Sequence, residues 1–394
     1  MKILSVNAGS SSLKFQLYEM PEEKVLISGV FERIGIGNSF YTIKLDGEKI
    51  KKEVELKDHK MAFEKLVSEL MDNKVINSCD EIKAVGHRTV QGGEKYDHTV
   101  VIDDSVIGDM VKYSSLAPLH NPASITGIRA SQAVFPNALQ TAVFDTAFHA
   151  TMDKVSYMYP VPYEWYTEYG IRKYGMHGTS HRYVSKRMNE ILGREDTKVI
   201  TCHIGNGGSI SAVLNGKCID TSMGLTPNAG IMMGSRCGDI DCSIIPYIME
   251  CTGMTGKEVD TVLNKKSGLL GISGVSSDSR DVENGIKEGN ERCKLAQDMY
   301  VKRIVEYIAK YYVLLGGCDA IVLTAGVGEN SISTRKQILD KLEVLGIKID
   351  EEANNMRGEE KLITTKDSKI PVYVIPTDEE LMIAKDTYEI MNQG

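Results

Sequence analysis

The sequence predicts an α/β protein of two similar domains, and three of its features carry this prediction. Residues 4–15 (LSVNAGSSSLKF) and 198–222 (KVITCHIGNGGSISAVLNGKCIDTS) both show an apolar strand, a turn containing glycine and serine, and a second strand. Residues 138–148 and 319–330 are apolar strands that end in polar or glycine-rich segments, where α/β sheets usually bind ligands. Residues 291–315 carry apolar side chains at helical spacing, as expected of an amphipathic helix packed on a sheet.

Composition excludes several classes of function. A chain of 394 residues has room for about two or three domains with hydrophobic cores. Its formal net charge of -8 leaves no basic excess for nucleic acid or an anionic membrane, so any phosphate must be bound locally. The N-terminal residues do not resemble a secretory signal, and no uncharged apolar stretch is long enough to span a membrane. We therefore expect a cytoplasmic enzyme or binding protein with no nucleic-acid or membrane partner.

The first hairpin places small polar residues and glycine, at 7–12, between its two strands. Glycine and serine in such a turn let backbone N–H groups and hydroxyls converge on an anion without side-chain bulk. An ordinary hairpin turn explains the stretch equally well. The turn by itself leaves both interpretations open.

The second hairpin repeats the first about half a chain later. An Asn-x-Gly-Ser pattern occurs in both turns at an offset of 199 residues, matching Asn7, Gly9 and Ser10 with Asn206, Gly208 and Ser209. Two such patterns in matching strand contexts favour two similar α/β domains, whose hairpin loops face a shared cleft. An anion would bind in that cleft.

The C-terminal segment, residues 371–391, reads as a strand followed by a helix that returns to the first domain. Thr377 and Glu380 have the spacing of a capping box at the start of this helix. The glycines at 326–331 (GVGENS) do not form a dinucleotide fingerprint, and residues 252–259 (TGMTGKEV) depart from the Walker pattern. If the chain binds a nucleotide, it uses neither of these common loops.

Several cationic side chains lie in glycine-rich segments. Arg88 occurs in GHRTVQGGE, Arg236 in MMGSRCGDID, and His177 in YGMHGTSH. An isolated histidine is more often structural than catalytic, but several cations on such loops favour an anion clamp. The fixed fork of arginine suits carboxylate and phosphoryl oxygens.

Ten segments together resemble the acetate kinase family: VNAGSSSLKF, GHRTVQGGE, LAPLHNP, VFDTAFH, YGMHGTSH, HIGNGGS, GSRCGDID, SSDSRD, AGVGENS and PTDEEL occur in its order and spacing. The resemblance covers essentially the whole chain. It implies two duplicated actin-like ATPase (RNase H-like) domains flanking a nucleotide cleft. Residues 1–147 with 371–394 would form the first domain, with the first phosphate loop. Residues 148–370 would form the second, with the second phosphate loop, the adenosine pocket and the dimer interface.

The resemblance also implies which residues form the site. Asn7 and Glu379 would hold magnesium. The implied catalytic residues are Asp145, His177 and Arg236. Those that would bind the substrate are Arg88, Val90, Leu119 and Pro227. Those that would bind ATP are Lys14, His203, Ile204, Gly205, Asn206, Gly207, Asp278, Ser279, Arg280, Gly326, Val327, Gly328, Glu329 and Asn330.

The implied reaction is a reversible, Mg2+-dependent in-line phosphoryl transfer between ATP and acetate, giving acetyl phosphate and ADP, with Mn2+ as a substitute metal. Acetate is already ionised at neutral pH, so the reaction depends on positioning and charge neutralisation rather than on a base. We therefore expect Asp145 to orient magnesium through water. The resemblance also implies a homodimer.

Two alternatives stay open. Gln91 and Met176 depart from the usual family residues, which are histidine and phenylalanine, so propionate or another short-chain carboxylate is an alternative acceptor. More remotely, the architecture fits a nucleotide-switch ATPase of the actin and Hsc70 type, because a fold does not by itself fix function. Acyl phosphate formation separates the two classes.

Overall fold

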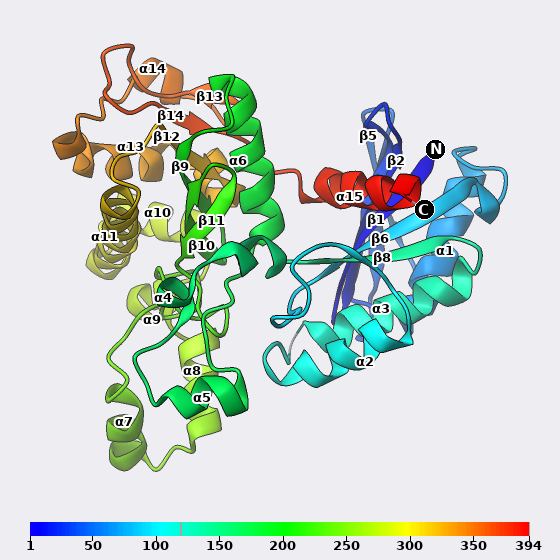
Figure 1. Ribbon diagram of the computed structural model, residues 1–394, viewed down its shortest axis with the longest axis horizontal. Coiled ribbons are helices and arrows are strands. Elements are labelled where there is room, and N and C mark those ends of the chain that lie inside the picture. Colours follow the sequence, from blue (N-terminus) through cyan, green and yellow to red (C-terminus); the bar gives the residue numbers. More distant parts are fainter. Residues whose placement is uncertain (119, 394) are drawn as a thin grey trace. The chain divides into compact units, whose positions relative to one another are not determined.

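The computed structural model describes residues 1–118 and 120–393 and divides into two compact units (Figure 1). Unit 1 comprises Met1–Phe148 and Asp378–Gly394, and unit 2 comprises His149–Thr377. From the sequence we expect the chain to return to the first domain at residue 371. In the structure it returns to unit 1 after Thr377. The reason is strand β14 (Val372–Val374), which pairs with β12 (Ala320–Thr324) and so belongs to the sheet of unit 2.

Unit 1 is built on an eight-stranded sheet in the order β5-β4-β3-β2-β1-β6-β8-β7. Its strands are β1 (Lys2–Gly9), β2 (Ser12–Glu19), β3 (Lys24–Glu32), β4 (Phe40–Leu45), β5 (Glu48–Glu53), β6 (Ile82–Thr89), β7 (Val100–Val101) and β8 (Leu139–Phe144). β1 and β2 form the predicted hairpin, with Asn7 opposite Lys14. β6 runs parallel to both β1 and β8, so their carboxyl ends share one edge of the sheet.

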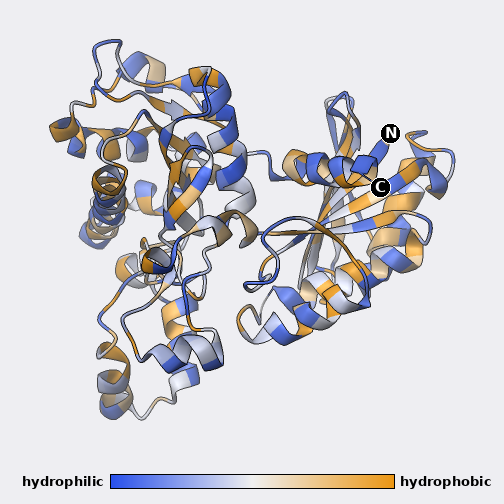
Figure 2. Cartoon of the chain, viewed as in Figure 1, coloured by the Kyte–Doolittle hydropathy of each residue, from blue (hydrophilic) through white to orange (hydrophobic). Residues whose placement is uncertain are grey.

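Helices cover both faces of this sheet. They are α1 (His59–Asp72), α2 (Asp104–Lys112), α3 (Asn121–Val134) and α15 (Glu379–Gln393). Because side chains alternate along a strand, Leu4 and Val6 of β1 pack with residues of α1 and α3, whereas Ile3 packs with Ala384 of α15. Figure 2 shows orange and blue segments alternating along α1 and α3, as expected of helices with one buried face.

The start of α15 differs from the predicted capping box. The carboxylate of Asp378 accepts a hydrogen bond from the Leu381 N–H at 2.9 Å, so Asp378 caps the helix. Thr377 instead donates its hydroxyl to Ser180 at 2.8 Å, and Glu380 pairs with Lys14. The spacing is compatible with either cap, and tertiary partners decided between them.

Unit 2 contains a six-stranded sheet in the order β11-β10-β9-β12-β14-β13. Its strands are β9 (Lys198–Ile204), β10 (Gly208–Leu214), β11 (Lys217–Thr221), β12, β13 (Lys361–Leu362) and β14. The predicted strand, turn and strand pattern of residues 198–222 is confirmed. The segment after β12 forms the short helix α12 (Ala325–Asn330) where the sequence predicts a loop.

The other helices of unit 2 are α4 (Lys154–Tyr157), α5 (Tyr163–Tyr169), α6 (Gly178–Leu192), α7 (Ile244–Thr252), α8 (Gly256–Lys265), α9 (Gly268–Ser273), α10 (Ser279–Lys287), α11 (Glu291–Leu314), α13 (Ile332–Lys341) and α14 (Glu351–Asn354). The long helix α11 confirms the amphipathic helix predicted at 291–315. Its Ile304 and Ile308 pack with Ile200 and Cys202 of β9 in the largest core. None of the helices in the described part of the chain has the length and apolarity needed to cross a membrane.

The duplication is visible in the strand order. In unit 1 the strands β3-β2-β1-β6-β8 follow each other across the sheet, and in unit 2 the strands β11-β10-β9-β12-β14 do the same. Both sets contain an antiparallel hairpin followed by parallel pairings. The predicted offset of 199 residues, which matches Asn7 with Asn206, does not pair equivalent positions. Asn7 lies within strand β1, whereas Asn206 lies in the loop between β9 and β10.

His87 of β6 makes unit 1 sensitive to acid. Burial lowers the pKa of its imidazole from 6.5 to about 4, although the hydrogen bond that the ring donates to Gln140 Oε1 acts to raise it. Between these values the unfolded chain binds a proton that the folded chain does not, so stability is full above pH 6.5 and falls as the pH drops towards 4. We expect a loss of about 3 kcal/mol over this window, at about 1.4 kcal/mol for each pH unit.

The measurement is hydrogen exchange of the β6 and β8 amides between pH 7 and pH 4. The variant H87Q, which keeps an amide near Gln140, should be less stable at pH 7 but should lack this acid-dependent loss. The matched control is H98Q, because the His98 side chain is 72% exposed. An unchanged pH slope in H87Q contradicts the prediction.

Candidate functional site

Unit 1 gathers one cation and two carboxylates at the shared edge of β6 and β8. The Arg88 guanidinium donates from Nε and Nη2 to the two oxygens of Asp145, at 3.2 and 2.6 Å. Its Nε also lies 3.6 Å from Glu379 Oε2. Arg88 is near the end of β6, Asp145 directly follows β8, and Glu379 begins α15. The parallel pairing of the two strands explains why residues 57 positions apart meet.

The charge of this cluster is unbalanced. Burial raises the pKa of Glu379 to about 7, and the negative charges of Asp145 and Glu380 add to the rise, whereas Arg88 opposes it. Lys14 and Glu380 form a separate ion pair at 2.5 Å. Asp145 and Glu379 therefore share the single positive charge of Arg88, which is hydrogen-bonded to Asp145 and lies 3.6 Å from Glu379.

This donor set fits a divalent metal ion. Carboxylate and amide oxygens are the ligands that Mg2+ prefers, and a cation would balance the charge of Glu379. Asn7 lies directly opposite Lys14 in the β1–β2 hairpin, so these two side chains share one face of the sheet. Because Glu380 pairs with Lys14, Glu379 is the better candidate for the metal.

Unit 2 presents a glycine loop, residues 205–207, between β9 and β10. A Cβ atom on Gly207 would lie 3.3 Å from Arg236 Nη1 and 3.4 Å from His177 Nε2. Glycine therefore lets the Arg236 guanidinium and the His177 imidazole approach the loop backbone. The structure thus brings Gly207, His177 and Arg236 together, although they are far apart in the sequence.

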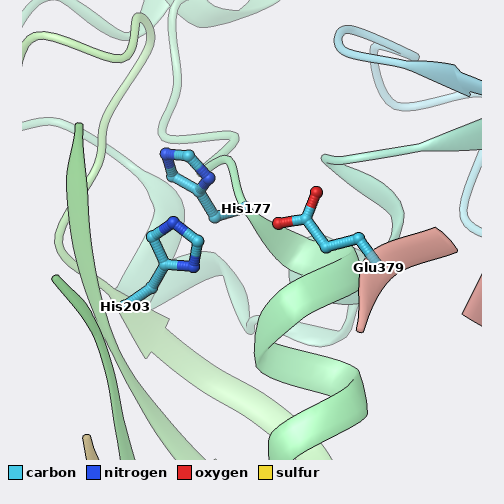
Figure 3. Close-up of side chains that lie close together, drawn as sticks. All are labelled: His177, His203 and Glu379. Carbon is cyan, nitrogen blue, oxygen red and sulfur yellow. The ribbon is translucent and has the colours of Figure 1, made fainter. Parts of the chain in front are cut away.

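His177 is held in an uncommon conformation. Its φ of 58° lies in the left-handed region, which costs about 1–3 kcal/mol for a residue other than glycine. Its ring stacks on that of His203 with centroids 4.1 Å apart (Figure 3), and His149 donates to the preceding carbonyl of Met176 at 3.0 Å. His203 in turn lies 2.8 Å from the Ser180 hydroxyl. These contacts fix the position of the His177 ring.

Arg236 differs from Arg88 in having no carboxylate partner in the described part of the chain. Among the described residues, its Nη1 donates to the Pro227 carbonyl at 3.3 Å and to the Met233 sulfur at 3.8 Å. Burial lowers the pKa of its guanidinium. A desolvated arginine without a counter-ion is suited to an incoming anion.

A pocket of about 650 Å3 adjoins the glycine loop in unit 2. Eight of the residues expected to bind ATP line it: Gly205, Asn206, Asp278, Ser279, Arg280, Gly326, Val327 and Asn330. The pocket has five further lining residues that were not expected from the sequence: Leu269, Ser277, Glu283, Ser331 and Arg357. Ser277 directly precedes the expected residues Asp278, Ser279 and Arg280, and Glu283 follows them closely, so proximity could have indicated both. Nothing in the sequence pattern points to Leu269 or Arg357.

Other expected ATP-binding residues do not line this pocket. Glu329 accepts hydrogen bonds from the N–H groups of Ala325, at 2.7 Å, and Thr377, at 3.1 Å. Ile204 is buried in the core, and Gly328 packs over Leu323. These three residues therefore belong to the framework of β9 and α12 rather than to the lining of the pocket. Lys14 belongs to unit 1.

The residues expected around the acyl group are distributed over both units. Val90 is buried in unit 1, and Pro227, whose carbonyl accepts from Arg236, belongs to unit 2. Leu119 lies outside the described residues. An acyl pocket made of these residues stays a prediction.

Gly234 offers a test of the pocket wall. A Cβ atom there would lie 1.9 Å from Asn206 Oδ1 and 2.6 Å from the Ser277 carbonyl oxygen, so the variant G234A must displace two lining residues. We expect a loss of kcat/KM for the nucleotide of about a hundredfold, because misplacement by about 1 Å has effects of this size. The control is G256A, where a Cβ meets open space. Equal activity of the two variants contradicts the prediction.

The matching strand orders and the cations beside a glycine loop define a phosphotransferase of the duplicated actin-like ATPase class. The family model for the acetokinase family matches residues 2–385, and the chain therefore belongs to that family. Acetate kinase from Bacillus cytotoxicus is 53% identical over 395 residues, covering 100% of both chains. Acetate kinase 1 from Listeria monocytogenes is 52% identical over 393 residues, covering 99% of both.

The chain is also similar to solved structures of acetate and propionate kinases. The crystal structure of acetate kinase from Porphyromonas gingivalis has a TM-score of 0.94 at 47% identity and covers 99% of each chain. The crystal structure of a propionate kinase from Francisella tularensis has a TM-score of 0.93 at 43% identity, covering 98% of this chain and 99% of that one. The chain is thus similar to kinases of two short-chain carboxylates, and it is itself a kinase of this family.

Proposed function

We propose that the protein transfers the γ-phosphoryl group of ATP to acetate, reversibly and with Mg2+, giving acetyl phosphate and ADP. One oxygen of the acetate carboxylate forms a bond to the γ-phosphorus while the bond from that phosphorus to the β,γ-bridging oxygen breaks. The observation that carries the proposal is Arg236, a desolvated guanidinium without a carboxylate partner among the described residues, beside His177 and the glycine loop. Family membership supports it.

The residues of unit 2 bind the nucleotide and its transferred group. The loop at Gly205, Asn206 and Gly207 takes the phosphates, and the adjoining pocket takes the nucleoside. Arg236 and His177 neutralise the charge that spreads over the phosphoryl oxygens in the transition state. The strained backbone of His177, fixed by its neighbours, keeps the ring in place before the substrate binds.

The residues of unit 1 hold the metal and the acceptor. Asn7 and Glu379 are the ligands that we propose for Mg2+, which neutralises phosphate charge when bound, and Mn2+ has the same ligand preferences. Asp145 has both oxygens engaged by Arg88, so it acts on the metal through water rather than directly. Arg88 binds the acetate carboxylate. No residue has to remove a proton, because acetate is already an anion.

Propionate is the second candidate acceptor, because the chain is 43% identical to a protein described as a propionate kinase. Val90, Leu119 and Pro227 are the residues that we propose around the acyl chain. One additional methylene changes binding by about 1–3 kcal/mol, so a small difference in this pocket decides the preference. We further propose that the enzyme acts in the cytoplasm as a homodimer.

The test is acyl phosphate formation from ATP and Mg2+, trapped with hydroxylamine, with acetate, propionate and butyrate at equal concentrations. Product with acetate as the preferred acid supports the proposal, and preference for propionate supports the second candidate. If no acid gives product while ATP is bound and hydrolysed, the proposal is wrong and a nucleotide switch takes its place. Omission of the metal should abolish the product.

A further inference from the structure

Glu283 is a carboxylate of the pocket wall that the proposed reaction does not use. It belongs to α10 and lines the pocket next to the glycine loop. Its Oε1 accepts hydrogen bonds from the hydroxyls of Ser331, at 2.5 Å, Ser333, at 2.9 Å, and Thr334, at 3.4 Å. In the described part of the chain no group donates to Oε2. The side chain is therefore fixed through one oxygen and keeps the other for a ligand.

The position of Glu283 indicates which part of a nucleotide it meets. A Cβ on Gly205 would lie 3.7 Å from Ala325 Cβ, so the glycine loop adjoins the first residue of α12. Ser331, which donates to Glu283, follows the last residue of α12. The six residues of α12 span about 9 Å. The glycine loop and Glu283 thus lie at opposite ends of this helix.

The charge and polarity of the pocket lining also indicate that the phosphates lie at the glycine loop and the nucleoside lies near Glu283. A carboxylate repels phosphate groups, so the phosphates belong at the glycine loop and not at Glu283. Leu269 and Val327 add apolar surface to the same pocket, which suits the faces of a flat base. The group that reaches Glu283 must be a neutral hydrogen-bond donor.

We propose that Glu283 accepts a hydrogen bond from the nucleoside part of the bound nucleotide and so contributes to nucleotide selection. The donor is a ribose hydroxyl or the exocyclic amine of adenine, both of which present a hydrogen to a carboxylate. This inference rests on the proposed function only in that an adenine nucleotide occupies this pocket. If Glu283 only linked α10 to α13, its replacement would not change the affinity for particular nucleotides. The proposal requires that it does.

The test is calorimetric titration of ADP, 2′-deoxy-ADP, 3′-deoxy-ADP and IDP into the full chain and into the variant E283Q. The amide keeps the hydroxyl contacts but is a weaker acceptor, so we expect ADP to bind about tenfold more weakly. The matched control is E288Q, because Glu288 is exposed at the end of the same helix and does not line the pocket. That variant should bind all four nucleotides as the unmodified chain does.

The analogues identify the donor. The analogue without the donor group should bind more weakly than ADP to the unmodified chain. Its affinity should not fall further in E283Q. An equal loss for all four nucleotides, or no loss for any, overturns the assignment. Binding of ADP requires neither acetate nor transfer, so normal ADP binding without an E283Q effect overturns this inference alone. Failure of the unmodified chain to bind any nucleotide overturns the proposed function and this inference with it.

Discussion

Replacing Arg236 with alanine is expected to lower kcat/KM for acetyl phosphate synthesis by about a thousandfold, because the transition state loses a desolvated positive charge. The geometry makes this effect large. Arg236 is mostly buried, and none of the described residues offers it a carboxylate. Its positive charge is therefore available to the phosphoryl oxygens. In an arginine paired with a carboxylate, that charge would already be partly neutralised.

The measurement is steady-state synthesis under saturating Mg2+, for R236A and for R236K. Lysine keeps the charge but loses the planar fork, so R236K should recover part of the activity. The control is R303A, which removes a half-exposed arginine of α11 that pairs with Glu306. The fold of R236A should be retained, because the unmodified side chain makes no ion pair with any of the described residues. Activity within tenfold of the unmodified protein would sink the proposed role of Arg236.

Replacing Arg88 with alanine should reduce both activity and stability. Activity should fall by about a thousandfold, because the acceptor carboxylate loses its cation. The carboxylates of Asp145, which is 1% exposed, and Glu379 are then left without their positive neighbour. Removal of one partner from a buried ion pair costs about 3–5 kcal/mol.

Two measurements separate these effects: kcat/KM for acetate, and the urea midpoint of unit 1 with and without Mg2+. Added Mg2+ should raise the midpoint of R88A more than that of the unmodified protein, since the metal replaces the missing positive charge next to Glu379. The variant R129A, which removes an exposed arginine of α3, is the matched control and should change neither quantity. If R88A keeps the unmodified midpoint, the ion pair does not stabilise unit 1 as the geometry requires.

The contrast between the two arginines was not predictable from the sequence. Both occur in glycine-rich segments, and both are implied by the family resemblance. In the structure one is held by two carboxylates and the other by none among the described residues. The partner Glu379 lies almost three hundred residues beyond Arg88, where local patterns carry no information.

The sequence by itself determined the local elements, the duplication and the set of charged groups. Strand alternation, hairpin turns and helical spacing depend on near neighbours, so β1–β2, β9–β10 and α11 were predictable. The tertiary structure decided the cap of α15, the crossing after Thr377, the orientation of Glu329 away from the pocket, and the presence of Glu283 in its wall. Each of these features depends on contacts between residues that are far apart in the sequence. Such residues become neighbours only when the sheets form, so local patterns do not predict which of them will pair.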